Sequence, residues 1–427
     1  MRLSKLPAMP RLLLTNRVFT KNTLVLFAIS TVGNILGYIY LIFVGRALEP
    51  QSFGTFGALY GIFYIFCLLG DSLRISIAHQ ITSLTVQIGA LAALRVILAP
   101  LVKFLAMGLI IIFALAISSK PIASFFQMET AGPILVLTAT LISALFLSIL
   151  LGVCQGLQKY LKLAVLGYLA PQSLKLIFVL LFVWLGWGLT GAIGSLLVSN
   201  IITIISGLLL LRLAVPSFQN DTGVRVSLRS LTSAFLLIGI VISLPTSGDV
   251  MLVTHYFTPH EAGIYNAVAT MGKVILFLPV AISLVMLPQV SQQHAAGNGT
   301  IEVLVRSLVY VIIISGLAVL LYWLLPDFII GVFLGEQYSA AAAYLGWYGT
   351  AMLLFAANYL LVQYYLAVSN RPAVLTAVFI TLSQVVAIVL AHSSTWYIII
   401  ILLMGNLILL ILNIIPLLKS KEKQGLH

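Results

Sequence analysis

The chain has 427 residues, of which 61% are hydrophobic and only 7% are charged. Ordinary soluble domains carry about a quarter charged residues, so this composition excludes a soluble globular protein and indicates an integral membrane protein. The net charge of +12 would suggest nucleic-acid binding in a soluble domain. Here the basic residues stand in short connections between apolar blocks, where they act as topology signals, and we expect no nucleic-acid partner.

The apolar residues form blocks of about twenty rather than an alternating pattern, which favours transmembrane helices over a barrel. In chain order, the blocks predict twelve spans at residues 22–44, 54–78, 101–117, 133–157, 163–185, 188–211, 233–253, 264–287, 307–325, 342–366, 373–391 and 396–416. The segment 86–99 before the third span is also apolar, but it holds Arg95 and stops at Pro100. It is open to two interpretations, an interfacial helix or the start of a longer tilted span.

The basic residues support an even number of spans with both termini in the cytoplasm. Of the 22 Lys and Arg residues, eighteen then fall on the cytoplasmic side, Arg46 and Lys120 fall outside, and Lys175 and Lys273 lie within spans. A missed or invented span would destroy this asymmetry, because every later connection would change sides.

The connections divide the chain into two halves of six spans. We predict a basic cytoplasmic segment (residues 1–21), a first lobe (22–212), a cytoplasmic linker (213–232), a second lobe (233–416) and a basic tail (417–427). The segment Gly45 to Ala58 repeats weakly 209 positions later: Pro50 meets Pro259, Gly54 meets Gly263 and Ala58 meets Ala267. Both copies follow the first span of their half, which predicts a parallel repeat and a cleft between two similar bundles.

Two motifs carry a family resemblance. One is R-A-L-x-P-x-x-F-G-x-F, beginning at Arg46, and the other is D-x-M-L-V-x-x-x-x-x-P-x-E-A-G-I-Y-N-A, beginning at Asp249 and followed by L-P-V-A-I-S-L-V-M-L-P. With them, residues 22–416 resemble the polysaccharide transporter branch of the multidrug/oligosaccharidyl-lipid/polysaccharide flippase superfamily. The first span has no acidic residue, unlike the drug antiporter branch, and twelve spans are fewer than the fourteen of the peptidoglycan-precursor branch.

The resemblance implies an all-α membrane protein with two pseudo-symmetric six-helix lobes around a central cavity. It also implies a flippase, not an enzyme, that moves a polyprenyl-pyrophosphate-linked oligosaccharide from the cytoplasmic to the outer leaflet. A cation-coupled antiporter of small amphiphiles is the alternative on the same fold. The expected partners are the lipid-linked substrate and membrane lipids, with a polysaccharide polymerase and chain-length proteins as candidates, and we expect a functional monomer. We expect no cofactor, and no P-loop is present for ATP hydrolysis.

Charged residues inside spans are the first candidates for the transport site, because each one is costly in lipid and needs a partner or water. Lys273 lies nine residues into its span, about 14 Å deep, where it either attracts the pyrophosphate or pairs with Asp249 on the neighbouring span. Lys175 is its expected counterpart in the first half, with no acidic residue at that depth. Asp71 and Arg74, at positions i and i+3, form either a structural ion pair or a gate.

Uncharged amides and prolines complete the candidates. Asn34 and Asn266 are expected either to bind sugar hydroxyls or to join helices by hydrogen bonds, as are Asn358, Gln155 and Gln363. Pro171, Pro245 and Pro279 predict kinks within spans. His255, His260 and Glu261 cluster in one outer turn, but we expect no metal site there.

Overall fold

The computed structural model describes residues 17–88, 106, 108–110, 112–211 and 244–424, and these residues fold into helices joined by short turns. The N-terminal part comprises α1 (Arg17–Ala47), α2 (Pro50–Ile88), α4 (Ser119–Phe125), α5 (Gly132–Gly156), α6 (Tyr160–Ala164), η2 (Val165–Leu169), α7 (Ala170–Trp184) and α8 (Gly188–Leu211). The C-terminal part comprises η3 (Leu244–Gly248), α10 (Asp249–Tyr256), α11 (Pro259–Gly272), η4 (Lys273–Leu276), α12 (Phe277–Ala295), α13 (Ile301–Leu324), α14 (Pro326–Phe333), η5 (Glu336–Ala341), α15 (Ala342–Ala367), α16 (Arg371–Leu390) and α17 (Thr395–Gln424).

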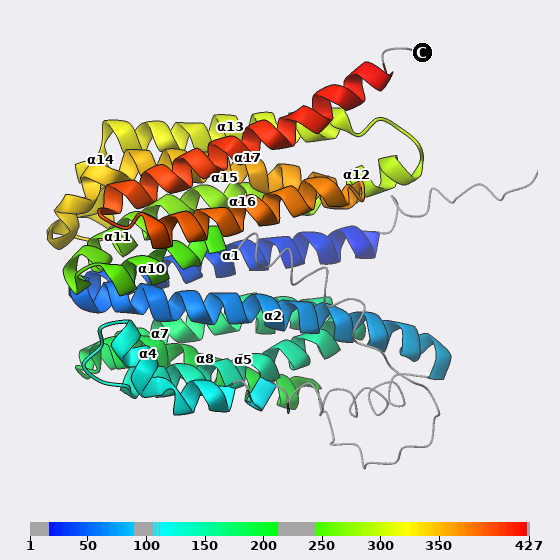
Figure 1. The fold of residues 1–427 in the computed structure, drawn as a ribbon. Coiled ribbons are helices and arrows are strands. Elements are labelled where there is room, and N and C mark those ends of the chain that lie inside the picture. Colours follow the sequence, from blue (N-terminus) through cyan, green and yellow to red (C-terminus); the bar gives the residue numbers. More distant parts are fainter. Residues whose placement is uncertain (1–16, 89–105, 107, 111, 212–243, 425–427) are drawn as a thin grey trace, which may run out of the picture.

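The helices form two stacked lobes. Figure 1 shows the N-lobe, α1 to α8, below the C-lobe, α10 to α17, with the axes of the long helices roughly parallel to one another. The end at which α1 begins and α17 ends is called the termini end below. The opposite end, which carries the turns before α2 and α11, is called the turn end. The all-α fold in two lobes, predicted from the sequence, is confirmed.

Ten helices of the described part of the chain are long and apolar enough to cross a membrane, or eleven if the bent pair Gly108–Ile117 and Ser119–Phe125 counts as one span. They match ten of the twelve predicted spans. The predicted third and seventh spans, and the 213–232 linker, lie partly or wholly outside the described residues. The chain is therefore a multi-pass membrane protein.

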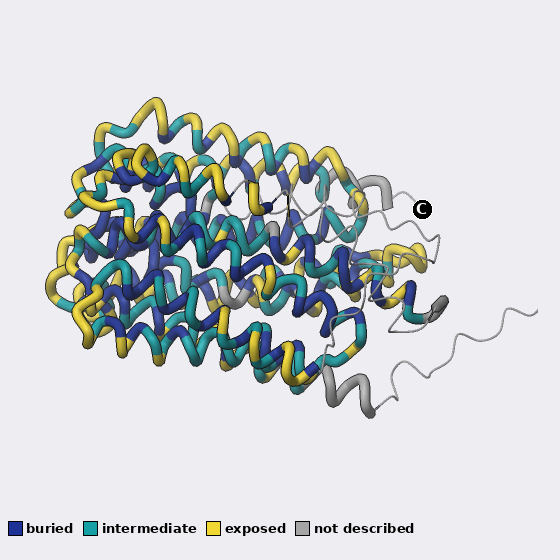
Figure 2. The backbone as a smooth tube through the Cα atoms, turned by 90° about the horizontal axis from the view of Figure 1, so that it is seen from below, coloured by how far each residue is buried: buried dark blue, intermediate teal, exposed yellow. Residues whose placement is uncertain are grey.

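Apolar side chains surround most of these helices. Figure 2 shows the buried positions concentrated inside the bundle, while exposed positions follow its outer helices. Within the N-lobe, α5 approaches α2 through small residues, since a Cβ on Gly152 or on Gly156 would lie within 3 Å of Ile77 or Ile81. Close approach at small residues is how helices associate when lipid removes the hydrophobic driving force between them.

Helix ends depart from the predicted span boundaries. The second span was expected to end at residue 78, yet α2 continues to Ile88, and α17 continues past Pro416 to Gln424. Hydropathy marks where a helix leaves the apolar layer, whereas the polar residues that follow, such as Gln80 and Thr82, do not break a helix.

The three prolines expected to kink spans all stand at irregular helical segments. Pro171 is the second residue of α7, directly after the π-helical segment η2. Pro245 lies within the π-helical segment η3, and Pro279 follows the 3-10 segment η4. Proline lacks an amide hydrogen and its ring clashes with the preceding turn, so the regular hydrogen-bond pattern changes beside each of them. Lys175, Asp249 and Lys273 lie on or near these segments.

Candidate functional site

The two copies of the sequence repeat are in direct contact at the turn end. α2 begins at Pro50 and α11 begins at Pro259, the position that the repeat assigns to it. A Cβ on Gly54 would lie 2.7 Å from the backbone nitrogen of Gly263, and a Cβ on Gly263 would lie 1.9 Å from the carbonyl oxygen of Pro50. Any side chain at these two glycines would therefore force the lobes apart.

Hydrogen bonds reinforce this contact between the lobes. The side-chain amide of Asn266 on α11 donates to the carbonyl oxygen of Phe53 on α2 over 2.7 Å. The Tyr338 hydroxyl donates to the carbonyl oxygen of Leu48 over 3.1 Å. Deeper in the bundle, the hydroxyl of Tyr38 on α1 donates to a carbonyl of α11. The lobes are thus closed on each other at the turn end.

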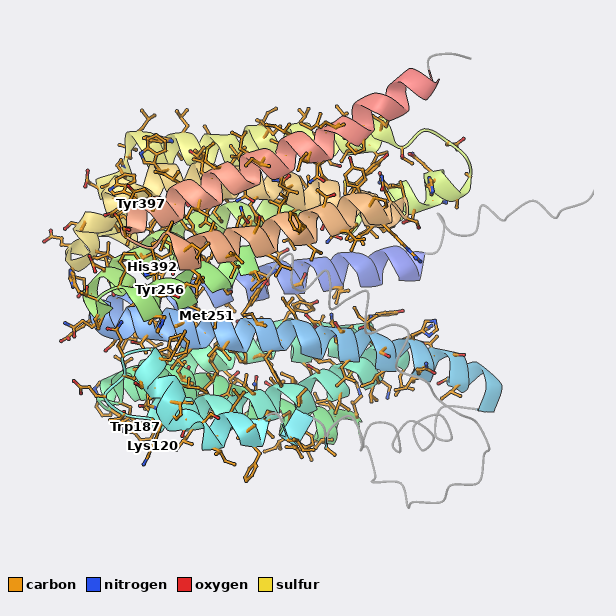
Figure 3. All side chains as sticks on the ribbon, in the orientation of Figure 1. Lys120, Trp187, Met251, Tyr256, His392 and Tyr397 are labelled. Carbon is orange, nitrogen blue, oxygen red and sulfur yellow. The ribbon has the colours of Figure 1, made fainter. Side chains whose placement is uncertain are left out.

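A second contact between the lobes joins the end of α4 to the end of α10. The Gln127 side-chain amide donates to the carbonyl oxygens of His255 and Phe257 over 2.8 and 2.9 Å. The ring of His255 stacks on that of Phe125, with 3.8 Å between the centroids. Beside it, Figure 3 shows Tyr256 next to His392, whose rings also stack at 3.8 Å. The described residues contain no group of three or more His, Cys, Asp or Glu placed to hold a metal, so His255 belongs to a packing contact.

Gly61 is the last glycine of α2 that lies against the C-lobe. Gly54, Gly57 and Gly61 each lie against the C-lobe: a Cβ on Gly57 would clash with Asn266, and one on Gly61 would lie 3.3 Å from the Cβ of Ser247. Toward the termini end, α2 bears two exposed side chains, Tyr64 at 40% and Asp71 at 55%, whereas Leu68 is half-buried and Ser72 is buried. Positions separated by three or four residues lie on one face of a helix, so Tyr64 continues the side of α2 that bears Gly57 and Gly61.

Lys175 lies inside the N-lobe, 5% exposed. Its Nζ lies 4.5 Å from the ring centroid of Tyr40 and 5.8 Å from that of Tyr60. No ion pair of Lys175 occurs among the described residues. Aromatic faces attract a cation through their quadrupole, which offsets part of the cost of burying it.

Asp249 is buried in the C-lobe, 1% exposed. Its Oδ2 accepts hydrogen bonds from the hydroxyls of Tyr265 and Tyr348, over 3.0 and 2.8 Å. Its Oδ1 has no hydrogen-bond partner among the described residues. Two tyrosines on different helices thus hold the carboxylate through Oδ2, while Oδ1 is left without a hydrogen bond from the described residues.

Lys273, half-buried at the start of η4, is not in ion-pair contact with Asp249 in this conformation, although the two charges interact electrostatically. That Lys175 is its counterpart in the first half stays a prediction. Lys273 follows Pro259 by 14 residues on the second helix of its half, and the residue in the same place on α2 is Tyr64, 14 residues after Pro50. Lys175 lies on α7.

Asp71 and Arg74 form an ion pair near the middle of α2, with 3.1 Å between Arg74 Nε and Asp71 Oδ1. The Asp71 side chain is 55% exposed and that of Arg74 is 16% exposed. The guanidinium also interacts with Tyr168 of η2. The pair therefore links α2 to the irregular segment that precedes Lys175.

The amide candidates divide into two groups. Asn266 and Asn358 join helices, the latter by donating to the carbonyl oxygen of Asn406 over 2.8 Å. Asn34 is exposed on α1, one turn toward the termini end from Tyr38, and no hydrogen bond of its side chain occurs within the described part of the chain. Gln155 keeps a buried oxygen without a partner there, and Gln363 donates to the hydroxyl of Tyr359 over 2.9 Å.

Tyrosines are the residues that sequence reasoning missed. Tyr60, Tyr64, Cys67, Asp71 and Arg74 recur at intervals of three and four, which places them along one side of α2. This spacing was readable from the sequence. The spacing does not stand out in the sequence, because many other aromatic residues of similar apolar character occur along the spans.

The family comparison agrees with the geometry. A family model described as "Polysaccharide biosynthesis protein" matches residues 19–294. None of the curated proteins matches this sequence. Among solved structures, an inward-facing multidrug resistance MATE family transporter of the MOP superfamily is similar, with a TM-score of 0.71 and 15% identity over 93% of this chain and 99% of the other. Lipid II flippase MurJ in an inward closed conformation has a TM-score of 0.69 and 12% identity over 91% of this chain and 87% of the other.

An outward-facing structure of a MATE transporter is less similar. Its TM-score is 0.55, at 16% identity over 95% of each chain. The fold is thus that of the MOP superfamily.

Proposed function

This chain belongs to the polysaccharide biosynthesis protein family, and we propose that it is a flippase for a lipid-linked oligosaccharide. The substrate is a polyprenyl-pyrophosphate carrying a sugar unit for cell-surface polysaccharides such as O-antigen or exopolysaccharide. The sugar headgroup crosses between the lobes while the lipid tail stays in the bilayer. The membrane is the inner membrane, both termini are cytoplasmic, and the termini end is the cytoplasmic entrance.

One observation carries the proposal: the side of α2 that contacts the C-lobe at Gly54, Gly57 and Gly61 is followed, toward the termini end, by the exposed side chains of Tyr64 and Asp71. A charged side chain facing lipid costs roughly 2.5–3.5 kcal/mol, so an exposed charge on this face favours water between the lobes. Closure at one end and polar exposure toward the other are expected of a transporter open to one side.

The charged residues have distinct proposed roles. Lys175 and Lys273 attract the diphosphate, since no ion pair with another described residue neutralises either of them. Asp71 and Arg74 stand at the entrance, where Arg74 meets the anion first. Asn34 binds sugar hydroxyls, and Asn266 holds the lobes together until they rock apart.

Reconstitution tests the proposal. Proteoliposomes containing the purified protein and a fluorescent undecaprenyl diphosphate trisaccharide should show transfer of the label between leaflets. Protein-free vesicles supply the background rate. Absence of transfer by the folded protein under proton, sodium and potassium gradients would overturn the proposed function.

A second candidate function is cation-coupled antiport of small amphiphiles. The buried Asp249 favours it, because its Oδ1 is left without a partner among the described residues and antiport needs a titratable carboxylate. Drug resistance of cells expressing the protein, compared with cells expressing Asp249→Asn, separates the two functions. Resistance that depends on Asp249 supports antiport, whereas unchanged drug sensitivity in both strains supports the flippase.

A further inference from the structure

The short helix α14 lies at the turn end of the C-lobe, directly after the transmembrane helix α13. Figure 1 shows it set at an angle to the long helices. α13 ends at Leu324 and α14 begins at Pro326, and Leu325 between them has φ −135° and ψ 45°, outside the helical region. Pro326 cannot extend α13, because proline lacks an amide hydrogen. The chain therefore turns where α13 ends, and α14 starts at that level.

The two sides of α14 differ in what covers them. Ile330 and Leu334, four residues apart, are 0% and 1% exposed. Phe328 and Val332 are also four residues apart and lie on the opposite side, where they are 64% and 48% exposed. Apolar side chains of this size are favourably removed from water, so the exposed side of α14 calls for an apolar environment.

The buried side of α14 contacts the turn between α1 and α2 of the other lobe. A Cβ on Gly45 would lie 2.7 Å from Leu334 Cδ2. The side chains of Gln337 and Tyr338, in η5, both donate hydrogen bonds to the carbonyl oxygen of Leu48, over 3.2 and 3.1 Å. Residues 326–341, called the strap below, thus join the C-lobe to the N-lobe at the turn end.

Tryptophan rings beside α14 indicate the level of the membrane interface. Trp323, Trp347 and Trp396 lie near the turn-end termini of α13, α15 and α17, with successive ring centroids 5.1 and 6.4 Å apart and exposures of 36–47%. Tryptophan is enriched where spans meet the lipid headgroups. Phe328 follows Trp323 by only five residues, and Leu324 between them is 65% exposed. The exposed side of α14 therefore continues the lipid-facing surface of α13.

We propose that α14 is a membrane-interface helix, and that Phe328 and Val332 bind acyl chains of the leaflet at the turn end. The leaflet then holds one side of the strap, and the other side holds Leu48 of the N-lobe. Contact with lipid thereby supports the closed arrangement of the lobes, and opening at the turn end must break the hydrogen bonds to Leu48. The inference does not depend on which substrate crosses the membrane.

Spin-label accessibility in proteoliposomes tests the contact with lipid. Labels on Phe328→Cys and Val332→Cys, in a Cys67→Ala/Cys154→Ala background, should be relaxed more strongly by oxygen, which partitions into lipid, than by a water-soluble nickel chelate. A label on Ser339→Cys, exposed in η5, should show the reverse. Stronger relaxation by the nickel chelate at residues 328 and 332 would overturn the proposal. Low accessibility to both reagents there would also overturn it, because a protein partner or a second copy of the chain would then cover this side.

Hydrogen exchange in lipid nanodiscs, which needs no cysteine changes, tests the support of closure. Phe328→Asp places a charge on the lipid side, so the amides of residues 45–53 should exchange at least about tenfold faster. Phe328→Leu keeps the apolar contact and should leave their exchange unchanged. Unchanged exchange of residues 355–361, in the buried part of α15, shows that each variant is folded. If residues 45–53 exchanged equally in both folded variants, the leaflet would not support closure and the proposal would fail.

Discussion

Gly54 and Gly263 are in backbone contact across the two lobes, although they are 209 positions apart in the sequence (263 minus 54). They occupy the same place in the two repeats, so the repeats face each other across a pseudo-two-fold axis near this point. We infer that this contact holds the lobes closed at the turn end.

Replacing Gly263 tests that closure. A Cβ at this position would lie 1.9 Å from the carbonyl oxygen of Pro50, so Gly263→Ala must separate α2 from α11. We expect the lobes to open at the turn end, with a longer distance between spin labels placed on Lys120 and His260. Transport should fall by at least about tenfold, because a closed state that is destabilised by more than ~1.4 kcal/mol is populated at least tenfold less. Gly316→Ala, whose Cβ meets nothing within 4 Å, is the control and should leave both measurements unchanged.

Lys175→Met should lower transport without lowering the stability of the protein. Methionine fills the same space without a charge, and burying a cation without a counter-ion costs more than its contacts with Tyr40 and Tyr60 return. We expect thermal unfolding in detergent at an equal or higher temperature, and transport reduced at least about tenfold, the loss of one charge-assisted contact. Lys120→Met, which removes an exposed cation at the turn end (Figure 3), should transport normally. Normal transport by Lys175→Met would remove Lys175 from the substrate path.

A double-mutant cycle tests the Asp249 site. Tyr348→Phe leaves the buried carboxylate with one hydrogen bond fewer, which should lower the free energy of unfolding by about 1–3 kcal/mol. In the Asp249→Leu background the same change should cost little, because the acceptor is gone. Denaturant unfolding of the four proteins measures the coupling. Equal costs in both backgrounds would show that the hydroxyl of Tyr348 does not stabilise Asp249.

Asp71 and Arg74 should have opposite effects on substrate affinity. Asp71→Asn frees Arg74 for the diphosphate and should lower the substrate concentration for half-maximal transport, while Arg74→Gln should raise it. Stability should change by only ~0.2–1 kcal/mol in either variant, because the pair is partly exposed. Arg306→Gln breaks a comparable surface pair with Glu302, 3.0 Å apart, and serves as the control. If both variants changed the half-maximal substrate concentration in the same direction, the intact ion pair, rather than the Arg74 cation alone, would determine substrate affinity.

Much of the fold was predictable from local sequence. Ten spans and the irregular segments beside Pro171, Pro245 and Pro279 follow from apolar length and from proline chemistry. The helix starts at Pro50 and Pro259 did not, because the apolar blocks predicted spans that begin later, at residues 54 and 264. Helix ends such as Ile88 did not, because a helix continues into water wherever nothing breaks it.

The sequence by itself determined that this is a two-lobed helical membrane protein of a polysaccharide family, because lipid forces every span to be apolar and helical and the repeat survives in the turn motifs. Only the tertiary structure decided how the charges are held. It placed Lys175 against Tyr40 and Tyr60, gave Asp249 two tyrosines in place of Lys273, and left the side chain of Tyr64 on α2 exposed. Those pairings depend on which faces of distant helices meet, and in a chain that is apolar almost everywhere, periodicity does not record which faces meet.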